Sequence, residues 1–327
     1  MRCREMNNYN PNLLFIKPAR EEIEETNEIS KWLNKFRDER EFDGIKPETI
    51  KNDLTRLKVF LSFCYNRLDK GPDKLKTYDF VKFFNYLEKE RKLSKNTQKR
   101  YYDLLKVFYR IMRMKNVIAD FVEESRERKR FARIEVKKRD PADADIVNII
   151  LQKIINSRSR TKMRDALIIR FCYDTGCRIS EAVNLKMKDC NLKDGYFKFT
   201  GTKSHEERVS ACSEDTREFL KQYVQFNIKK GENSYLFQNK DGDKVDRNWI
   251  SEVFRKAVKE LKNEGKIPKN KRIVLHSTRN GRIMDLLDKL PIDVVSKIVG
   301  HSDVKVTMRY IDDKKRNDEF LKLLKKI

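Results

Sequence analysis

Apolar residues recur at helical spacing along most of the chain, and this periodicity constrains the fold more than any other feature. The first helical segment begins at Thr26, with Ile29, Leu33 and Phe36 on one face. Further helical segments are expected over residues 46–68, 77–92 and 94–116.

Capping residues support these segments. Pro47 lies near the start of the second segment, and Ser94 is a favourable N-cap for the fourth. We therefore expect a small helical domain over residues 26–122, preceded by a leader over residues 1–25. The aromatic residues of these helices follow the helical spacing, so we interpret them as core residues and not as platforms for stacked bases.

Residues 123–140 interrupt this pattern, because they are dense in Lys and Arg and have little apolar periodicity. We interpret them as a basic interdomain linker that lies along a nucleic-acid backbone, and a solvated helical extension is the alternative. A second domain is expected over residues 141–327. Asp140 is the predicted N-cap of its first helix, and Pro141 is the predicted first helical residue.

The second domain is predicted to combine helices with one antiparallel hairpin. A helix over residues 162–175 ends at Gly176, a further helix opens at residues 177–181, and two alternating strands flank residues 201–206. Later helices are expected over residues 214–229 and 248–264. The chain is therefore predicted to be mainly α with a small antiparallel β-sheet, an α+β fold.

The formal net charge of +24 calls for a polyanionic partner, and we expect nucleic acid. An anionic membrane surface is the competing polyanion, but no apolar run approaches the ~20 residues needed to span a bilayer. The N-terminal residues lack the apolar core of a signal peptide. The six cysteines form no C-x-x-C pair, which favours reduced, mostly buried thiols in a cytoplasmic, nucleoid-associated protein.

Residues 275–310 carry the clearest indication of function, because two of the three histidines lie there. His276 and Arg279 are expected on the first turn of a helix, His301 follows a glycine, and Tyr310 follows one short helix later. No Asp/Glu cluster, Gly-rich phosphate loop or Cys/His metal spacing accompanies them. The set indicates phosphoryl transfer in which cationic side chains, and not Mg²⁺, bind the phosphate. Taken singly, His301 could cap a helix and Tyr310 could pack in the core.

Six residues in one order resemble the tyrosine recombinases, the phage-integrase-like and Xer-like family. They are Arg178 in TGCRISE, Lys203 in the expected hairpin, His276 and Arg279 in HSTR, His301 in VGHS and Tyr310 in TMRY. The segments PETIKNDLTRLKVFLSF and LSKNTQKRYYDLLKVFYRI resemble that family's core-binding domain. The resemblance covers about residues 26–315. It implies a two-domain, C-shaped clamp with an N-terminal helical core-binding domain and a C-terminal catalytic domain.

The chemistry of these side chains fits the roles that the resemblance implies. Tyr310 is the expected nucleophile, since covalent capture divides one difficult step into two easier ones. Arg178 and Arg279 present forks of donors that match the phosphate oxygens. His276 and His301 can donate to the same oxygens or carry protons near neutral pH.

Two further residues complete the expected site. Lys203 on the hairpin suits a general acid that protonates the leaving 5′ oxygen, although the hairpin also offers Lys198 and Arg208. Glu181, one turn after Arg178, is expected to orient that arginine without contacting substrate.

The sequence departs from the family pattern on both sides of its motifs. Thr278 and Asn280 stand where the family often has a leucine and a histidine around the second arginine. We expect the loss of the apolar residue to loosen the packing of that helix slightly. Asp312 and Asp313 replace a histidine that often follows the tyrosine.

The resemblance implies a site-specific DNA recombinase or integrase of a mobile element. Tyr310 would form a 3′-phosphotyrosyl intermediate, and strands would be exchanged through a four-way junction without a metal, an organic cofactor or ATP. The expected partners are double-stranded DNA at attachment or recombination sites and further copies of the chain, as a dimer per site and a tetramer per synapse; no membrane is involved. The C-terminal segment 317–327 is expected to form an amphipathic helix that packs on its own domain or on a neighbouring protomer.

Contacts to the DNA backbone are expected from residues of the fourth helical segment and of the linker, although ordinary solvated surface explains any single one of them equally well. These candidates are Lys95, Asn96, Lys99, Arg100, Arg130 and Lys137. Two alternative functions remain at this stage: strand passage of the type IB topoisomerase kind, and DNA binding without catalysis.

Overall fold

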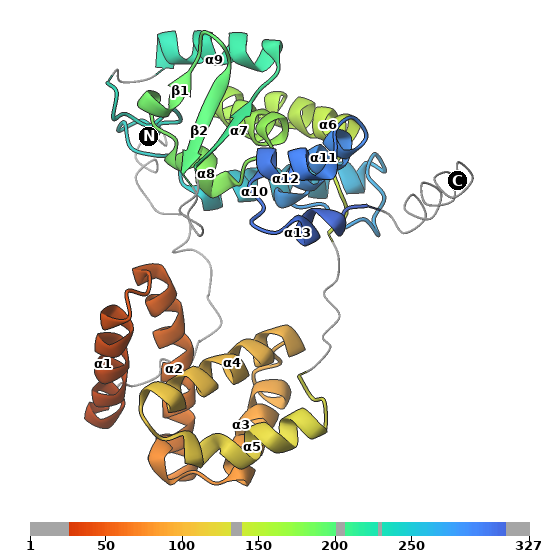
Figure 1. Ribbon diagram of the computed structural model, residues 1–327. Helices are drawn as coiled ribbons and strands as arrows, with labels where there is room; N and C mark the ends of the chain where they lie inside the picture. Colours follow the sequence, from red (N-terminus) through yellow and green to blue (C-terminus); the bar gives the residue numbers. More distant parts are fainter. Residues whose placement is uncertain (1–25, 132–138, 201–206, 228–230, 312–327) are drawn as a thin grey trace, which may run out of the picture. The chain divides into compact units, whose positions relative to one another are not determined.

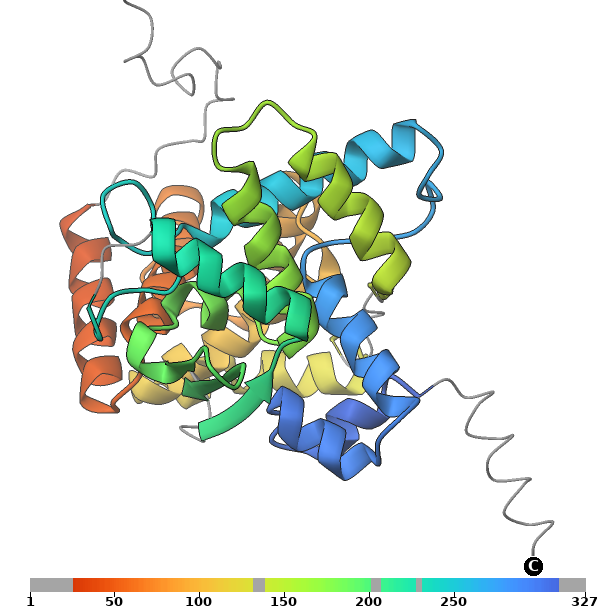
Figure 2. The same ribbon diagram turned by 90° about the horizontal axis from the view of Figure 1, so that it is seen from above.

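The computed structural model describes residues 26–131, 139–200, 207–227 and 231–311. They belong to two compact units that divide between Val136 and Lys137. Helices make up most of both units, and the strands form one small sheet (Figures 1 and 2). The predicted fold class, mainly α with a small antiparallel sheet, is confirmed. No described helix is long and apolar enough to cross a membrane.

The N-terminal unit is built from helices that begin where the capping residues predict. The Thr26 side chain accepts a hydrogen bond from the backbone N–H of Ile29, Pro47 occupies the first turn of the second helix, and Ser94 accepts from Thr97. The helices are α1 (Asn27–Phe42), α2 (Pro47–Leu68), α3 (Thr77–Lys89), α4 (Lys95–Ile111) and α5 (Lys115–Glu127), with a 3₁₀ turn, η3, at Pro72–Lys74.

Aromatic rings fill the core of this unit. The ring of Phe60 meets that of Phe83 edge to face at 5.0 Å, and that of Phe108 at 6.4 Å. All three side chains are buried. The interpretation of these aromatic residues as core is therefore confirmed, and such pairs contribute about 0.5–1.5 kcal/mol each beyond the burial of their area.

The helical unit extends beyond the end that we predicted at residue 122. Helix α5 continues to Glu127, with Ile118 and Phe121 buried. Phe131 is buried as well, and its ring stacks on Tyr102 at 4.4 Å. The segment that we assigned to a linker thus contains the end of a helix and a core residue. The charged composition of this segment does not indicate a core residue. Phe131 is buried because its ring stacks on Tyr102 of α4, a contact that the local sequence does not predict.

The C-terminal unit combines eight described helices with the sheet. The helices are α6 (Ala144–Ile155), α7 (Lys162–Thr175), α8 (Ile179–Asn184), α9 (Glu214–Asn227), α10 (Arg247–Asn263), α11 (His276–Leu287), α12 (Ile292–Val299) and α13 (Val304–Met308), and a 3₁₀ turn, η4, spans Met187–Asp189. The strands are β1 (Cys190–Asn191), β2 (Tyr196–Thr200) and β3 (Glu207–Ala211), in the order β1-β2-β3 and antiparallel. The strands β2 and β3 were predicted, whereas the two-residue β1 was not.

Helix α7 is the central element of this unit. Its residues from Ala166 to Ile169 are all buried, because α6, α9, α10 and α11 pack around it. As predicted, the helix ends at Gly176, which has a φ of 62°. The chain then turns directly into the segment that carries Arg178. Of the six cysteines, the five that the structure describes are free thiols, and three of them are buried.

The start of the unit differs from our prediction. Asp143, and not Asp140, caps α6, since its carboxylate accepts from the backbone N–H of Ile146 at 2.9 Å. Asp140 instead pairs with the backbone N–H of Arg272 at 2.6 Å. Ala142 donates its N–H to the carbonyl of Ser277 at 2.9 Å. Residues 140–142 are therefore held beside the start of α11, and this tertiary contact overrides the helix-start signal of Pro141.

This contact explains a glycine inside α11. A Cβ on Gly281 would overlap the carbonyl group of Ala142. The absence of a side chain therefore lets residues 140–142 approach the helix closely.

Replacing Gly281 with alanine tests this packing. In an exposed helix the change would stabilise the protein by about 1 kcal/mol. Here the overlap with backbone atoms should reverse the sign and lower the free energy of unfolding by about 1–3 kcal/mol. Urea unfolding measures the difference.

Gly265→Ala is the control, because Gly265 has a φ of 74° but a Cβ there would meet no atom within 4 Å. This variant measures the cost of backbone strain alone, which is about 1–2 kcal/mol. A Gly281→Ala protein as stable as the wild type would contradict the close approach.

Candidate active site

Arg279 is the most deeply buried charged residue of the motif that we predicted. It lies on the first turn of α11 and is 1% exposed. Its guanidinium donates to the carbonyl oxygens of Gly176 and Val299, each at 2.6 Å. It thereby joins the C-terminal ends of α7 and α12. Burial, with the charge of Arg178 nearby, lowers the pKa of Arg279 to about 10, so the group stays charged at neutral pH.

Arg178 lies immediately before α8 and keeps part of its side chain in solvent, with 41% exposed. Its Nη1 donates to Oε1 of Glu181 at 2.8 Å, and its backbone N–H donates to Oε2 of the same carboxylate at 2.8 Å. The predicted contact between Arg178 and Glu181 is present.

Arg208 on β3 was named only as an alternative to Lys203, and it proves to be a central contact. Its guanidinium donates to Oε2 of Glu181 at 2.6 Å and to the carbonyl of Ile298 at 2.9 Å. It also lies 4.4 Å from the centre of the Phe199 ring. Burial opposes ionisation of Glu181, but Arg208 and Arg178 together lower the pKa of that carboxyl. The carboxylate of Glu181 therefore pairs with both Arg178 and Arg208.

A glycine makes room for this arrangement. Gly300 ends α12 with a φ of 68°, and a Cβ there would come within 2.7 Å of Nε of Arg208. The alternation along β3 carried a usable signal, because Arg208 and Ser210 share the inward face of the strand. Lys198 pairs with Val209 and is exposed on the outward face. Of the two alternatives to Lys203, Arg208 is therefore the one on the inward face.

His276 and His301 are half-buried among these cations. Burial, followed by the charge of Arg279, lowers the pKa of each imidazole to about 4. The charges of Arg139 and Arg178 add to this effect at His276, and that of Arg178 adds to it at His301. Both are therefore neutral at pH 7, and a neutral imidazole carries one donor and one acceptor nitrogen. Nδ1 of His301 lies 2.8 Å from the hydroxyl of Thr307, which is fully buried.

Tyr310 lies at the edge of the same cluster. Its ring is nearly parallel to that of His301, with centroids 6.1 Å apart and an interplanar angle of 10°. Its hydroxyl donates to Oδ1 of Asn280 at 3.1 Å. The fold thus gathers five of the six predicted residues, Arg178, His276, Arg279, His301 and Tyr310. Lys203 lies outside the described residues, as do Lys137 and the C-terminal segment.

The predicted DNA contacts in the N-terminal unit have mixed surroundings. Lys95 and Lys99 are ion-paired with Glu88 and Asp103, at 2.6 and 3.2 Å. Arg130 lies 3.5 Å from the same Glu88. Asn96 and Arg100 are exposed on the first turns of α4. Exposed ion pairs of this kind contribute little to stability, so they leave both lysines available to a phosphate backbone.

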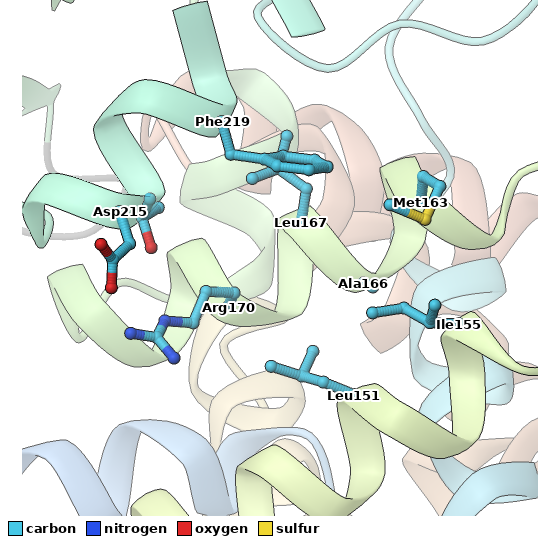
Figure 3. A pocket seen from close by; sticks show the side chains of 9 residues that line it. Leu151, Ile155, Met163, Ala166, Leu167, Arg170, Asp215 and Phe219 are labelled. Atoms are coloured by element: carbon cyan, nitrogen blue, oxygen red, sulfur yellow. The ribbon is translucent and has the colours of Figure 1, made fainter. Parts of the chain in front are cut away.

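A groove elsewhere in the C-terminal unit contains none of the predicted site residues. It lies between α6, α7 and α9, and Leu151, Ile155, Met163, Leu167 and Phe219 line it (Figure 3). Its volume of about 210 Å³ is below the ~300 Å³ typical of small-molecule sites. Among the described residues, no group of three or more His, Cys, Asp or Glu side chains could hold a metal ion.

Family comparisons agree with this arrangement. The family model for phage integrases matches residues 143–317, more than half of the chain, and a model for the phage integrase N-terminal SAM-like domain matches residues 32–117. The chain belongs to the phage integrase family. The resemblance to tyrosine recombinases drawn from the sequence is thus confirmed, and the protein is a site-specific recombinase that cuts and rejoins DNA.

Individual relatives match most of the chain. A probable integrase/recombinase protein of Methanocaldococcus jannaschii is 59% identical over 319 residues, 97% of each chain. The tyrosine recombinase XerA of Saccharolobus solfataricus is 29% identical over 289 residues, 84% of this chain and 87% of the relative.

Solved structures share the fold at lower identity. A lambda integrase dimer bound to a COC′ core site aligns with a TM-score of 0.67 and 19% identity, over 88% of this chain and 78% of that one. The Tn1549 transposon integrase in complex with transposon right end DNA aligns with a TM-score of 0.69 and 18% identity, over 90% and 99%.

The neutral histidines predict how the stability of the DNA-free protein depends on pH. In the unfolded chain an imidazole has a pKa of ~6.5, and in the folded protein the pKa is about 4 for His276 and His301. Between these values the unfolded state binds more protons, so stability is fully present above pH ~6.5 and falls as the pH approaches 4. After allowance for solvent screening, we expect a loss of about 1–2 kcal/mol per histidine.

Urea unfolding at pH 7, 6 and 5 measures this loss. His276→Gln and His301→Gln should each flatten the dependence, because glutamine binds no proton. Variants whose stability falls with pH as steeply as that of the wild type would show that these histidines are not held neutral.

Proposed function

We propose that Tyr310 is the nucleophile of this recombinase and attacks a DNA phosphate. The bond between Oη of Tyr310 and phosphorus forms, and the bond between phosphorus and the 5′ oxygen breaks. The phenol loses its proton, and the 5′ oxygen gains one. The product is a 3′-phosphotyrosyl bond and a free 5′-hydroxyl, and a 5′-hydroxyl from the partner duplex reverses the step. The observation that carries the proposal is the position of the Tyr310 ring beside His301, whose imidazole lies within the field of Arg279 and Arg178.

Two rounds of this exchange pass through a four-way junction. The energy of each broken phosphodiester is retained in the phosphotyrosyl bond, so the reaction needs no ATP. No step in the proposal uses a metal ion, because the arginines are proposed to stabilise the negative charge that develops on the phosphate.

The electrostatics of the cluster support the assignment of Arg178 and Arg279 as the phosphate clamp. Arg178 and Arg208 pair with the carboxylate of Glu181, the charge of Glu181 also acts on Arg279, and both imidazoles are neutral. A phosphate would relieve the mutual repulsion of the cations. His276 and His301 would then donate to the phosphate oxygens, and the phosphate charge would favour their protonated forms. Lys203 is proposed as the general acid for the leaving 5′ oxygen.

The proposed partners are double-stranded DNA and further copies of the chain. The net charge of +24 supports DNA binding through the backbone phosphates. Lambda integrase has been solved as a dimer on a core site and as a tetramer on a Holliday junction. We propose the same assembly here, with Lys95, Asn96, Lys99 and Arg100 on the DNA backbone.

The test is covalent capture. Wild-type protein is incubated in EDTA with supercoiled plasmid and with a pool of nicked duplexes, and the products are resolved by denaturing electrophoresis. We expect a protein–DNA adduct from the wild type and none from Tyr310→Phe. Arg178→Ala and Arg279→Ala should lower the rate of adduct formation by about 10²–10³-fold, the usual effect of losing a donor to a developing negative charge. Arg178→Lys is the matched control that keeps the charge but loses the fork.

Other outcomes would redirect the assignment. Relaxation of a plasmid without any requirement for two sites would favour strand passage of the type IB topoisomerase kind. Salt-sensitive DNA binding with no adduct from any variant would favour a binding protein without catalysis. An adduct from Tyr310→Phe would reject Tyr310 as the nucleophile.

A further inference from the structure

The hydroxyl of Tyr310 has a partner that the motif does not include. Asn280 follows Arg279 directly on α11 and is 8% exposed. Its Oδ1 accepts the hydrogen bond from Tyr310 at 3.1 Å. The two residues are 30 positions apart in the sequence, so the contact depends on the way that α12 and α13 return the chain to α11.

An asparagine at position 280 is expected to cost stability, because the position is buried and lies within a helix. Asparagine is a poor former of helix interiors. A buried amide without a hydrogen-bond partner costs stability that a leucine of similar size would not. Ile283, one turn further along α11, is apolar and buried, and Tyr310 packs against the cluster that contains it. The cluster on which Tyr310 packs is apolar, yet position 280 carries an amide that contacts the tyrosine oxygen, and this points to a function there.

We infer that Asn280 positions the nucleophile, through its contact with the oxygen that reacts. This inference rests on the proposed role of Tyr310. An amide can follow a phenol through the loss of its proton, because it carries both an acceptor and a donor. Oδ1 accepts from the neutral hydroxyl, and a half-turn of the amide brings the N–H group of Nδ2 toward the deprotonated oxygen. The same side chain thus holds Oη before and during the attack on phosphorus.

The arrangement links the nucleophile to the phosphate clamp through one helix. Arg279 and Asn280 are neighbours on α11, and Arg279 is fixed by the carbonyls of Gly176 and Val299. The position of the Tyr310 oxygen is therefore set relative to the arginine that binds the phosphate. A displacement of about 1 Å in such a geometry can cost ~10²-fold in rate.

Three substitutions separate this role from a purely structural one. Asn280→Leu removes both the acceptor and the donor at nearly constant size. Asn280→Asp keeps the acceptor and removes the donor. Thr278→Val is the matched control, because Thr278 is 1% exposed on the same helix and its hydroxyl donates to the carbonyl of Leu275 at 2.8 Å, away from the tyrosine.

The primary readout is the single-turnover rate of adduct formation on a nicked duplex, with the DNA dissociation constant measured separately. We expect Asn280→Leu to lower that rate by about 10- to 100-fold with unchanged DNA affinity. Asn280→Asp should lower the rate at least as far, and its added negative charge next to Arg279 should also weaken DNA binding. Thr278→Val should leave the rate within about twofold of the wild type. Equal losses from Asn280→Leu and Thr278→Val, or no loss from Asn280→Leu, would overturn the inference.

A second readout does not need activity. In a double-mutant cycle on urea unfolding, Asn280→Leu and Tyr310→Phe should be non-additive, because each removes the same hydrogen bond. Additive effects would overturn the inference even where adduct forms. Non-additive effects without any adduct from the wild type would keep the contact, but would reject its role in attack together with the proposed function.

Discussion

The buried guanidinium of Arg279 is the constraint on which the rest of the site depends. A charge removed from water is tolerated only where hydrogen bonds replace its hydration. Here the replacements are the carbonyls of Gly176 and Val299, at the C-terminal ends of two helices. Such carbonyls lack partners within their own helix and lie at the negative end of its dipole. The arginine satisfies them, and in doing so it fixes the end of α7 relative to the end of α12.

This single contact places the other functional groups. Arg178 follows Gly176 by two residues, and His301 follows Val299 by two. Arg208 then joins the two segments a second time, because it bridges Glu181 and the carbonyl of Ile298. The result is a cluster with three guanidiniums, one carboxylate and two neutral imidazoles. The positive charge that folding leaves unbalanced there is the property that a phosphate-binding site requires.

The sequence predicted the elements of this site better than the contacts within it. Helical spacing and the terminal glycine located α7, and the order of the motif residues identified the family. The alternation along β3 places Arg208 on the inward face, but its contacts with Glu181 and Ile298 could not be predicted, because they join segments far apart in the sequence. The contact of Asn280 with Tyr310 could not be predicted for the same reason. The same reason explains why Phe131 and the cap of α6 were misplaced. Lys203 and the roles of the individual side chains stay predictions.

Tyr310, the proposed nucleophile, is held less firmly than Arg279, a member of the proposed phosphate clamp. Helix α13 is five residues long, and Thr307 is its buried residue. Segments with few buried contacts open at a low cost in free energy, whereas a buried, hydrogen-bonded guanidinium does not move independently of the core. The position of the phenol therefore depends largely on the contacts of Tyr310 with Asn280 and His301. Under the proposed function, this division lets rigid arginines bind the phosphate before a separately held tyrosine attacks it.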